Sequence, residues 1–210
     1  RALEELRRGF VFHYAGDQHL ASIVRHGIDD WGDAGFSFCV PSIAAGYPRS
    51  WRPDKEGRPV RNRPAPGLPN TGDYKDGLDN KLSVFAIGNP AAKNRKGRLA
   101  TLHDKASGFG VARFNAKTGA IKMECWRLLF DAAKPRPDDQ FPGWPKTIRY
   151  TDNYGRKPVA HLPSIKITGM KNPVIQVKDS KGELVYALRI RGSSYRPPVF
   201  DQEESYEVRV

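Results

Sequence analysis

Residues 10–24, FVFHYAGDQHLASIV, decide how the first half of the chain is interpreted. A continuous apolar run, the pattern of a buried strand, stops at Gly16, and Asp17 and His19 follow within three residues. In α/β folds, ligand groups lie on loops at the carboxyl ends of strands. The sequence therefore places a carboxylate and an imidazole, two residues apart, where a ligand site is expected.

The apolar pattern that resumes after this turn predicts a helix. Leu20, Ile23 and Val24 keep the i, i+3, i+4 spacing of a helix face, and Gly27 would be its C-cap. Upstream, residues 2–8 (ALEELRR) have the same kind of spacing and predict the end of another helix.

Composition limits the class of protein. The 210 residues have room for one large domain, or for a medium domain with a small one attached. No apolar run approaches the roughly 20 residues of a membrane span. The formal charge of +12 suits polyanionic partners, but no RNA-binding motif, basic helix or Cys/His finger is present, which disfavours nucleic acid. Cys39 and Cys125 sit in apolar runs and predict two buried free thiols, with a disulfide left open.

Further apolar runs at residues 35–40 and 81–89 predict strands, and residues 108–130 predict a hairpin with its turn at residues 117–119. Between them, residues 46–80 are rich in Pro, Gly and Arg and too long for an ordinary connection. They form either a disordered insert or an ordered functional loop. Their aromatic residues favour order.

The last third of the chain reads as β only. Residues 131–145 contain four prolines and predict a linker between domains. After it, residues 146–210 alternate apolar and polar residues in short runs, including a hairpin around residues 180–182. Short strands at this spacing predict a small antiparallel β-sandwich-like module.

Asp17 and His19 suit a metal ion, because a hard oxygen and a borderline nitrogen together match Zn, Fe or Mn. Gly16 lets the backbone turn without a Cβ in the way. In a second interpretation, Asp17 caps the following helix and His19 is a surface residue in its first turn. The four residues alone favour the second interpretation, because short motifs often match by chance.

A wider resemblance changes that preference. A buried strand ending in Gly-Asp-x-His resembles the last metal-binding block of the calcineurin-like metallophosphoesterases, in the PhoD-like (alkaline phosphatase D) branch, where Asp replaces the more usual first His. The stretches GDQHLASIVRHGIDDWGDAGFSFCVPSIA, HDKASGFGVARFNAKTGAIKMECW and DNYGRKPVAHLPSIKITG also resemble that branch. The likeness covers nearly the whole chain and is weakest in residues 46–80.

The resemblance implies an α+β fold in which residues 1–130 form the C-terminal half of a metallophosphoesterase β-sandwich flanked by helices. The linker and the appended all-β module would follow. It also implies export to the periplasm or the extracellular space, as in related secreted enzymes.

By the same resemblance, Asp17 and His19 would be ligands of a site with two metal ions (Fe, Ca, Zn or Mn) that hydrolyses phosphomonoesters or phosphodiesters. The family's earlier blocks, Asp-x-His, Gly-Asp-x-x and Gly-Asn-His/Asp, are missing from their expected place before Asp17. The chain begins at Arg1 rather than Met, which suggests processing, cleavage or partial coverage. Activity would therefore need the N-terminal half of the enzyme, as a separate fragment or chain.

Other residues are weaker candidates. His103, Arg49 and Arg52 could bind a substrate phosphate, although a turn and a solvated charged loop explain them equally well. His13 lies in an apolar strand, where a satisfied core histidine is the simpler interpretation and a hydrogen bond to a metal ligand the alternative. The rival function is a non-catalytic module that binds an anionic polymer through the arginine-rich loop of residues 46–80.

Overall fold

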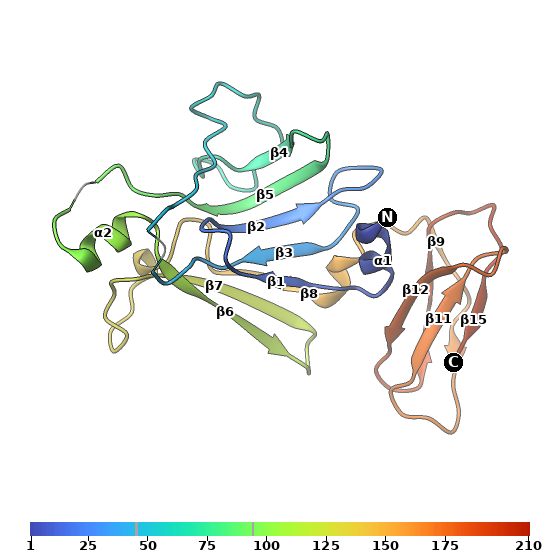
Figure 1. Cartoon of the computed structure of the whole chain (residues 1–210). Helices are drawn as coiled ribbons and strands as arrows, with labels where there is room; N and C mark the ends of the chain where they lie inside the picture. The colour runs from blue at the N-terminus through green and yellow to red at the C-terminus, as the bar shows by residue number, and fades with distance from the viewer. Residues whose placement is uncertain (45, 94) are drawn as a thin grey trace.

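The structure is a computed structural model that describes residues 1–44, 46–93 and 95–210. It is mostly β-sheet (Figure 1). The helices described are α1 (Ala2–Arg8) and α2 (Arg98–Asp104). The strands are β1 (His13–Ala15), β2 (Ala21–His26), β3 (Phe36–Cys39), β4 (Gly72–Lys75), β5 (Lys81–Gly88), β6 (Gly108–Asn115), β7 (Ala120–Arg127), β8 (Lys146–Arg149), β9 (Ala160–His161), β10 (Ile165–Lys166), β11 (Val174–Lys178), β12 (Leu184–Arg189), β13 (Ser194–Tyr195), β14 (Pro198–Val199) and β15 (Glu207–Arg209). Within the described residues, no helix has the length and apolar character to cross a membrane.

The first sheet has five strands in the order β1-β3-β2-β5-β4. β1 pairs with β3 in parallel, and the other pairs are antiparallel. The strands expected at residues 35–40 and 81–89 are confirmed as β3 and β5. The apolar run before Gly16 forms the short edge strand β1, which is half-buried to exposed rather than fully buried.

The helix predicted from Leu20, Ile23 and Val24 is wrong, because these residues belong to or precede strand β2. β2 lies between β3 and β5, which pair with its backbone on both sides. Its side chains alternate between the two faces of the sheet, and the adjacent apolar residues Ile23 and Val24, one on each face, match a helical spacing with Leu20 by chance. The β-branched neighbours Ile23 and Val24 favour a strand.

A second sheet, in the order β6-β7-β8, packs against one face of the first. The expected hairpin is confirmed, with Gly119 at a positive φ of 71° in its turn. The core between the sheets is a cluster of buried residues that includes Ile23, Phe38 and Met123, each with no exposed surface. The two sheets approach closely at Gly110, where a Cβ would collide with a methyl carbon of Val40.

The long segment of residues 46–80 is ordered over the part that the structure describes, and it contributes strand β4 to the first sheet. Asp54 holds the loop together. Its carboxylate accepts two hydrogen bonds of 2.9 Å from Arg63 and one of 2.8 Å from the Asn70 N–H. Burial alone would raise the pKa of Asp54, but these hydrogen bonds and the guanidinium charge hold it below its usual value.

The end of the chain forms a separate group of small sheets, drawn in orange and red in Figure 1. β11 pairs with β12 across the expected turn at residues 180–182 and with β15 on its other side. A second core cluster of buried residues lies here, including Ile175, Val177 and Tyr186. This part of the chain is β-rich, as expected.

Residues 131–145, expected as a linker, also contribute to the first core. Phe141 and Trp144 are buried in the cluster between the two sheets. The next strand, β8, pairs with β7 and belongs to the second sheet. The second core cluster draws its residues from later in the chain, beginning with Tyr154, and from Phe10 near the N-terminus.

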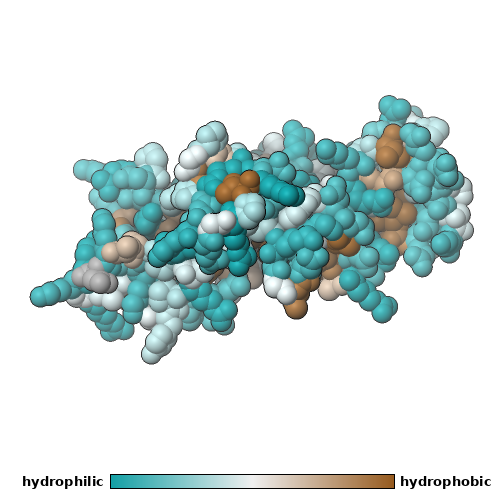
Figure 2. Space-filling view, turned by 90° about the horizontal axis from the view of Figure 1, so that it is seen from above, coloured by the Kyte–Doolittle hydropathy of each residue, from teal (hydrophilic) through white to brown (hydrophobic). Residues whose placement is uncertain are grey.

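Helices flanking the first sheet, which the resemblance implies, are not found among the described residues. α1 forms where expected but packs against β12 of the C-terminal group. α2 lies beyond the end of the sheets (Figure 1). Seen from above in Figure 2, hydrophilic residues cover most of the surface, and hydrophobic residues show only in small separate patches.

Candidate metal site

The turn between β1 and β2 brings Asp17 and His19 together at the end of the first sheet nearer α2 (Figure 1). The Nε2 atom of His19 lies 3.9 Å from Oδ1 of Asp17. The Asp17 side chain is fully exposed, and that of His19 is 31% exposed. Both residues have left-handed backbone conformations, with φ of 64° at Asp17 and 57° at His19. The turn therefore presents an oxygen and a nitrogen donor side by side.

The start of the long loop fixes the orientation of His19. The Nδ1 atom of His19 lies 2.8 Å from the backbone carbonyl oxygen of Tyr47, and the Arg49 N–H donates to the His19 carbonyl at 3.2 Å. A carbonyl oxygen only accepts, so Nδ1 must carry the proton of this hydrogen bond. In the neutral ring, Nε2 then holds the lone pair. That lone pair belongs to the nitrogen beside Asp17.

This arrangement fits a metal ligand pair. Ligating histidines commonly donate their other ring N–H to a carbonyl or carboxylate, which fixes the tautomer, and the contact between His19 and Tyr47 has this form. Two donors that lie about 2.0–2.2 Å from one tetrahedral zinc ion are about 3.4 Å apart. The 3.9 Å between Asp17 and His19 is about 0.5 Å longer, so the exposed Asp17 side chain would move slightly closer to His19 on binding a metal.

The pair is only part of a site. Across residues 1–44, 46–93 and 95–210, no group of three or more His, Cys, Asp or Glu side chains is placed to hold a metal ion. A catalytic zinc site has three protein ligands as a rule. The donor types of Asp17 and His19 therefore fit a metal, and the described chain supplies two donors toward it.

The other predicted residues lie on different elements. His13 begins β1, and its ring centroid is 6.0 Å from that of His26. Burial and then the neighbouring His13 lower the pKa of His26, whose Nε2 is 2.9 Å from Oγ of Ser37. No hydrogen bond joins His13 to Asp17 or His19 within the described residues.

His103, predicted to bind a substrate phosphate, has a structural contact. It lies in the last turn of α2, and its Nδ1 accepts a hydrogen bond of 3.1 Å from the Leu129 N–H. Burial, followed by the charges of Arg95 and Arg127, lowers the pKa of His103. The residue from this region that reaches the long loop is Lys105, whose Nζ donates to the Gly46 carbonyl at 2.7 Å.

Three of the five guanidinium groups in the long loop are engaged within the chain. Arg52 donates to the Pro90 carbonyl at 2.6 Å, and Arg63 binds the Asp54 carboxylate. Arg58 is 2.9 Å from a carboxylate oxygen of Glu56 and lies over the Trp51 ring. These contacts hold the loop in shape and leave fewer cations for an anionic polymer.

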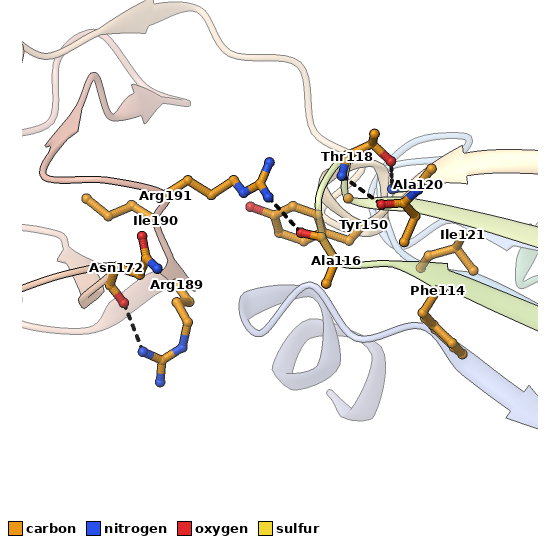
Figure 3. Close-up of a pocket in the computed structure, with 12 residues that line it drawn as sticks. Phe114, Ala116, Thr118, Ala120, Ile121, Tyr150, Asn172, Arg189, Ile190 and Arg191 are labelled. Atoms are coloured by element: carbon orange, nitrogen blue, oxygen red, sulfur yellow. Dashed lines mark hydrogen bonds between the residues drawn. The ribbon is translucent and has the colours of Figure 1, made fainter.

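Two cavities lie in the first part of the chain or at its border with the C-terminal group of sheets. One, of about 470 Å³, lies between the β6–β7 turn and the C-terminal group of sheets (Figure 3). Arg191 crosses it and donates to the backbone carbonyls of Ala116, at 2.9 Å, and Lys117. Its role there is to join the hairpin turn to the C-terminal group. The second cavity, of about 510 Å³, adjoins the β1–β2 turn, and Gly16 and Gln18 both line it.

Sequence reasoning missed the contribution of Tyr47, because a backbone carbonyl leaves no signature in the residue types. It also missed the cavity beside the turn, whose lining comes from alternate residues of β2. Those residues are Ser22, Val24 and His26, whose differing polarity gave no period-two signal in the sequence. The two cysteines were predicted correctly as buried free thiols.

No protein-family model matches the chain, and comparison with curated proteins and with solved structures finds no match either. The turn, the contacts that hold it and the residues that surround it are therefore the features that indicate a function.

Proposed function

We propose that this chain supplies the last ligand pair of a metal-dependent phosphoesterase of the PhoD-like kind. The observation that supports the proposal is the hydrogen bond from Nδ1 of His19 to the Tyr47 carbonyl, which leaves Nε2 beside the Asp17 carboxylate. A surface histidine that merely follows a helix cap has no need of this anchor. The residues expected to cap a helix in fact lead into strand β2.

The reaction class is hydrolysis of a phosphomonoester or phosphodiester. Metal ions bound at such a site polarise the phosphoryl oxygens and lower the pKa of a bound water. In this chain, Asp17 contributes a negative oxygen and His19 a neutral nitrogen. The contact with Tyr47 keeps the imidazole in the tautomer that has its lone pair at Nε2. The remaining ligands would come from the N-terminal half of the enzyme, as a separate fragment or chain.

The rival function, binding an anionic polymer through the arginine-rich loop, has less support. Arg52, Arg58 and Arg63 are engaged in contacts within the chain. The start of that loop also holds His19 in place. This makes the loop a support for the candidate site.

The test uses the chain assembled with its N-terminal half. Elemental analysis should find two metal ions per complex, and the complex should hydrolyse an aryl phosphodiester. Asp17→Ala and His19→Ala should each lower turnover at least about 100-fold, because each removes a ligand. Asp79→Ala is a matched control, since Asp79 also has a positive φ in an exposed turn but lies after the β4 strand. Full activity in either ligand variant, or an assembled sample without metal, would refute the assignment.

A further inference from the structure

The cavity of about 470 Å³ at the β6–β7 turn takes its apolar walls from two separate cores (Figure 3). Ile121 of β7 belongs to the core between the first two sheets, and Ile190, which follows β12, belongs to the C-terminal core. Phe114 of β6 also lines the cavity and is 66% exposed. Small-molecule sites are commonly concave, have mainly apolar and aromatic walls and lie where two packed units meet. This cavity has that position and those walls.

Two asparagines that line the cavity keep hydrogen-bond donors available. Oδ1 of Asn115 accepts from the N–H groups of Lys117, at 2.9 Å, and Thr118, at 3.1 Å. Oδ1 of Asn172 accepts from the Gly192 N–H at 2.7 Å. A backbone N–H only donates, so these contacts identify the amide oxygens and leave the NH2 groups on the other side. No hydrogen bond joins either NH2 group to another described residue, so both can serve a ligand.

The charged residues that line the cavity are two arginines. Arg191 donates to the carbonyls of Ala116, at 2.9 Å, and Lys117, and Arg189 donates to the Asn172 carbonyl at 2.9 Å. Each guanidinium group has five N–H donors, so both arginines retain donors after these contacts. No carboxylate lines the cavity among the described residues. The lining therefore offers positive charge and hydrogen-bond donors beside an apolar surface.

We propose that this cavity binds a small amphipathic anion. Its apolar body packs between Phe114 and Ile190, and its carboxylate or phosphate group accepts hydrogen bonds from Arg189 and Arg191. Hydrogen bonds between a guanidinium group and an oxyanion are among the stronger ones in proteins, because both partners are charged. The candidate metal site lies at the end of the first sheet nearer α2, whereas this cavity borders the C-terminal group of sheets (Figure 1). The inference is therefore independent of the proposed function.

The test uses 2-naphthoate and 2-naphthamide, which share an aromatic body and differ in charge. Calorimetric titration of the chain should find 2-naphthoate bound at least about tenfold more tightly than 2-naphthamide. Titration with 2-naphthyl phosphate then compares the two anionic groups. A tenfold preference for one anion identifies the preferred group, and equal affinities indicate that the cavity accepts both. Equal binding of 2-naphthoate and 2-naphthamide, or no binding of either anion, would overturn the proposal.

Arginine variants locate the anion. Arg189→Gln and Arg191→Gln should each weaken binding of 2-naphthoate at least about tenfold and leave binding of 2-naphthamide as in the wild type. That difference separates a lost contact with the anion from a disturbed cavity, which would weaken both probes. Arg98→Gln is the matched control, because it removes the same charge from an exposed arginine at the start of α2. An equal loss of affinity in Arg98→Gln would attribute binding to net charge and overturn the proposal.

A steric variant keeps the test decisive, because Arg191 also joins the β6–β7 turn to the C-terminal group. Ala116 lies exposed in that turn and lines the cavity, so Ala116→Trp occupies the cavity without removing a core contact. Binding of 2-naphthoate should fall at least about tenfold, while the circular dichroism spectrum stays that of the wild type. Unchanged affinity in this folded variant would place the probe elsewhere on the chain and overturn the proposal.

Discussion

Ile23 and Leu82 lie on opposite faces of the first sheet, and alanine at each position tests that arrangement directly. Both substitutions remove three carbon atoms. Ile23 has no exposed surface and belongs to the core between the two sheets. Leu82 is half-buried and lines the open cavity. We therefore expect a large loss of stability from Ile23→Ala and a small one from Leu82→Ala.

The magnitudes follow from burial. Replacing a buried isoleucine by alanine typically lowers the free energy of unfolding by about 2–5 kcal/mol, and the higher values accompany sites that cannot collapse. Ile23 is held between two sheets, so we expect about 3 kcal/mol. For Leu82, three carbons at about 0.8 kcal/mol each when fully buried give about 1 kcal/mol at half burial. With a urea dependence of about 3 kcal/mol per molar, the midpoints shift by about 1 M and about 0.3 M.

Tryptophan fluorescence is the appropriate assay for urea unfolding of the isolated chain. All four tryptophans precede residue 145, so their signal follows the part of the chain that contains β2 and β5 rather than the C-terminal group of sheets. This separation avoids mixing two transitions in one midpoint. Equal shifts for the two variants, or a larger shift for Leu82→Ala, would show that the two faces of the sheet have been assigned wrongly.

Two further predictions concern the histidines and the long loop. Burial lowers the pKa of both His26 and His103 below the unfolded value of about 6.5, so the unfolded state binds protons first and stability falls as the pH drops below that value. As the pH is lowered from about 7.5 to about 5.5, the thermal midpoint of the wild type should decrease. The decrease should be smaller in the double variant His26→Gln, His103→Asn. An equal decrease in both proteins would show that these two histidines do not cause the loss of stability. Residues 46–80 should resist brief trypsin digestion, because Asp54 ties the loop together through Arg63, and Asp54→Ala should be cleaved there while the rest of the chain survives. Cleavage of both proteins at the same rate would contradict that role for Asp54.

The parts of the fold that sequence predicted best are those with local signals. The β6–β7 hairpin combines two runs of strand-forming residues with a turn that ends in Gly119, and such signals need no tertiary information. β2 was predicted wrongly because Ile23 and Val24, which face opposite sides of the sheet, are both apolar and match a helical spacing together with Leu20. The polar residues Ser22, Arg25 and His26 are divided between the two faces, so the alternation typical of a strand with one solvent-exposed face is absent.

Prediction of the site was likewise limited to features that are visible in the local sequence. Asp17 and His19 could be singled out because their residue types and spacing are informative in the sequence. Their support could not be predicted, because His19 is oriented by the backbone carbonyl of Tyr47, 28 residues later, after a chain reversal. The packing of Phe141 and Trp144 into the first core was hidden for a related reason. The prolines around them suggested a linker, while burial depends on distant strands.

The left-handed residues of the turn explain why the long loop matters to the site. A non-glycine residue with positive φ is uncommon, and such strained positions persist only where surrounding structure holds them. Asp17 and His19 are two of them, separated by one residue. The Arg49 N–H and the Tyr47 carbonyl, both from the beginning of the loop, bond to the backbone and to the ring of His19. Releasing these contacts would let the turn relax and separate the two donors, so the loop helps to build the ligand pair that it adjoins.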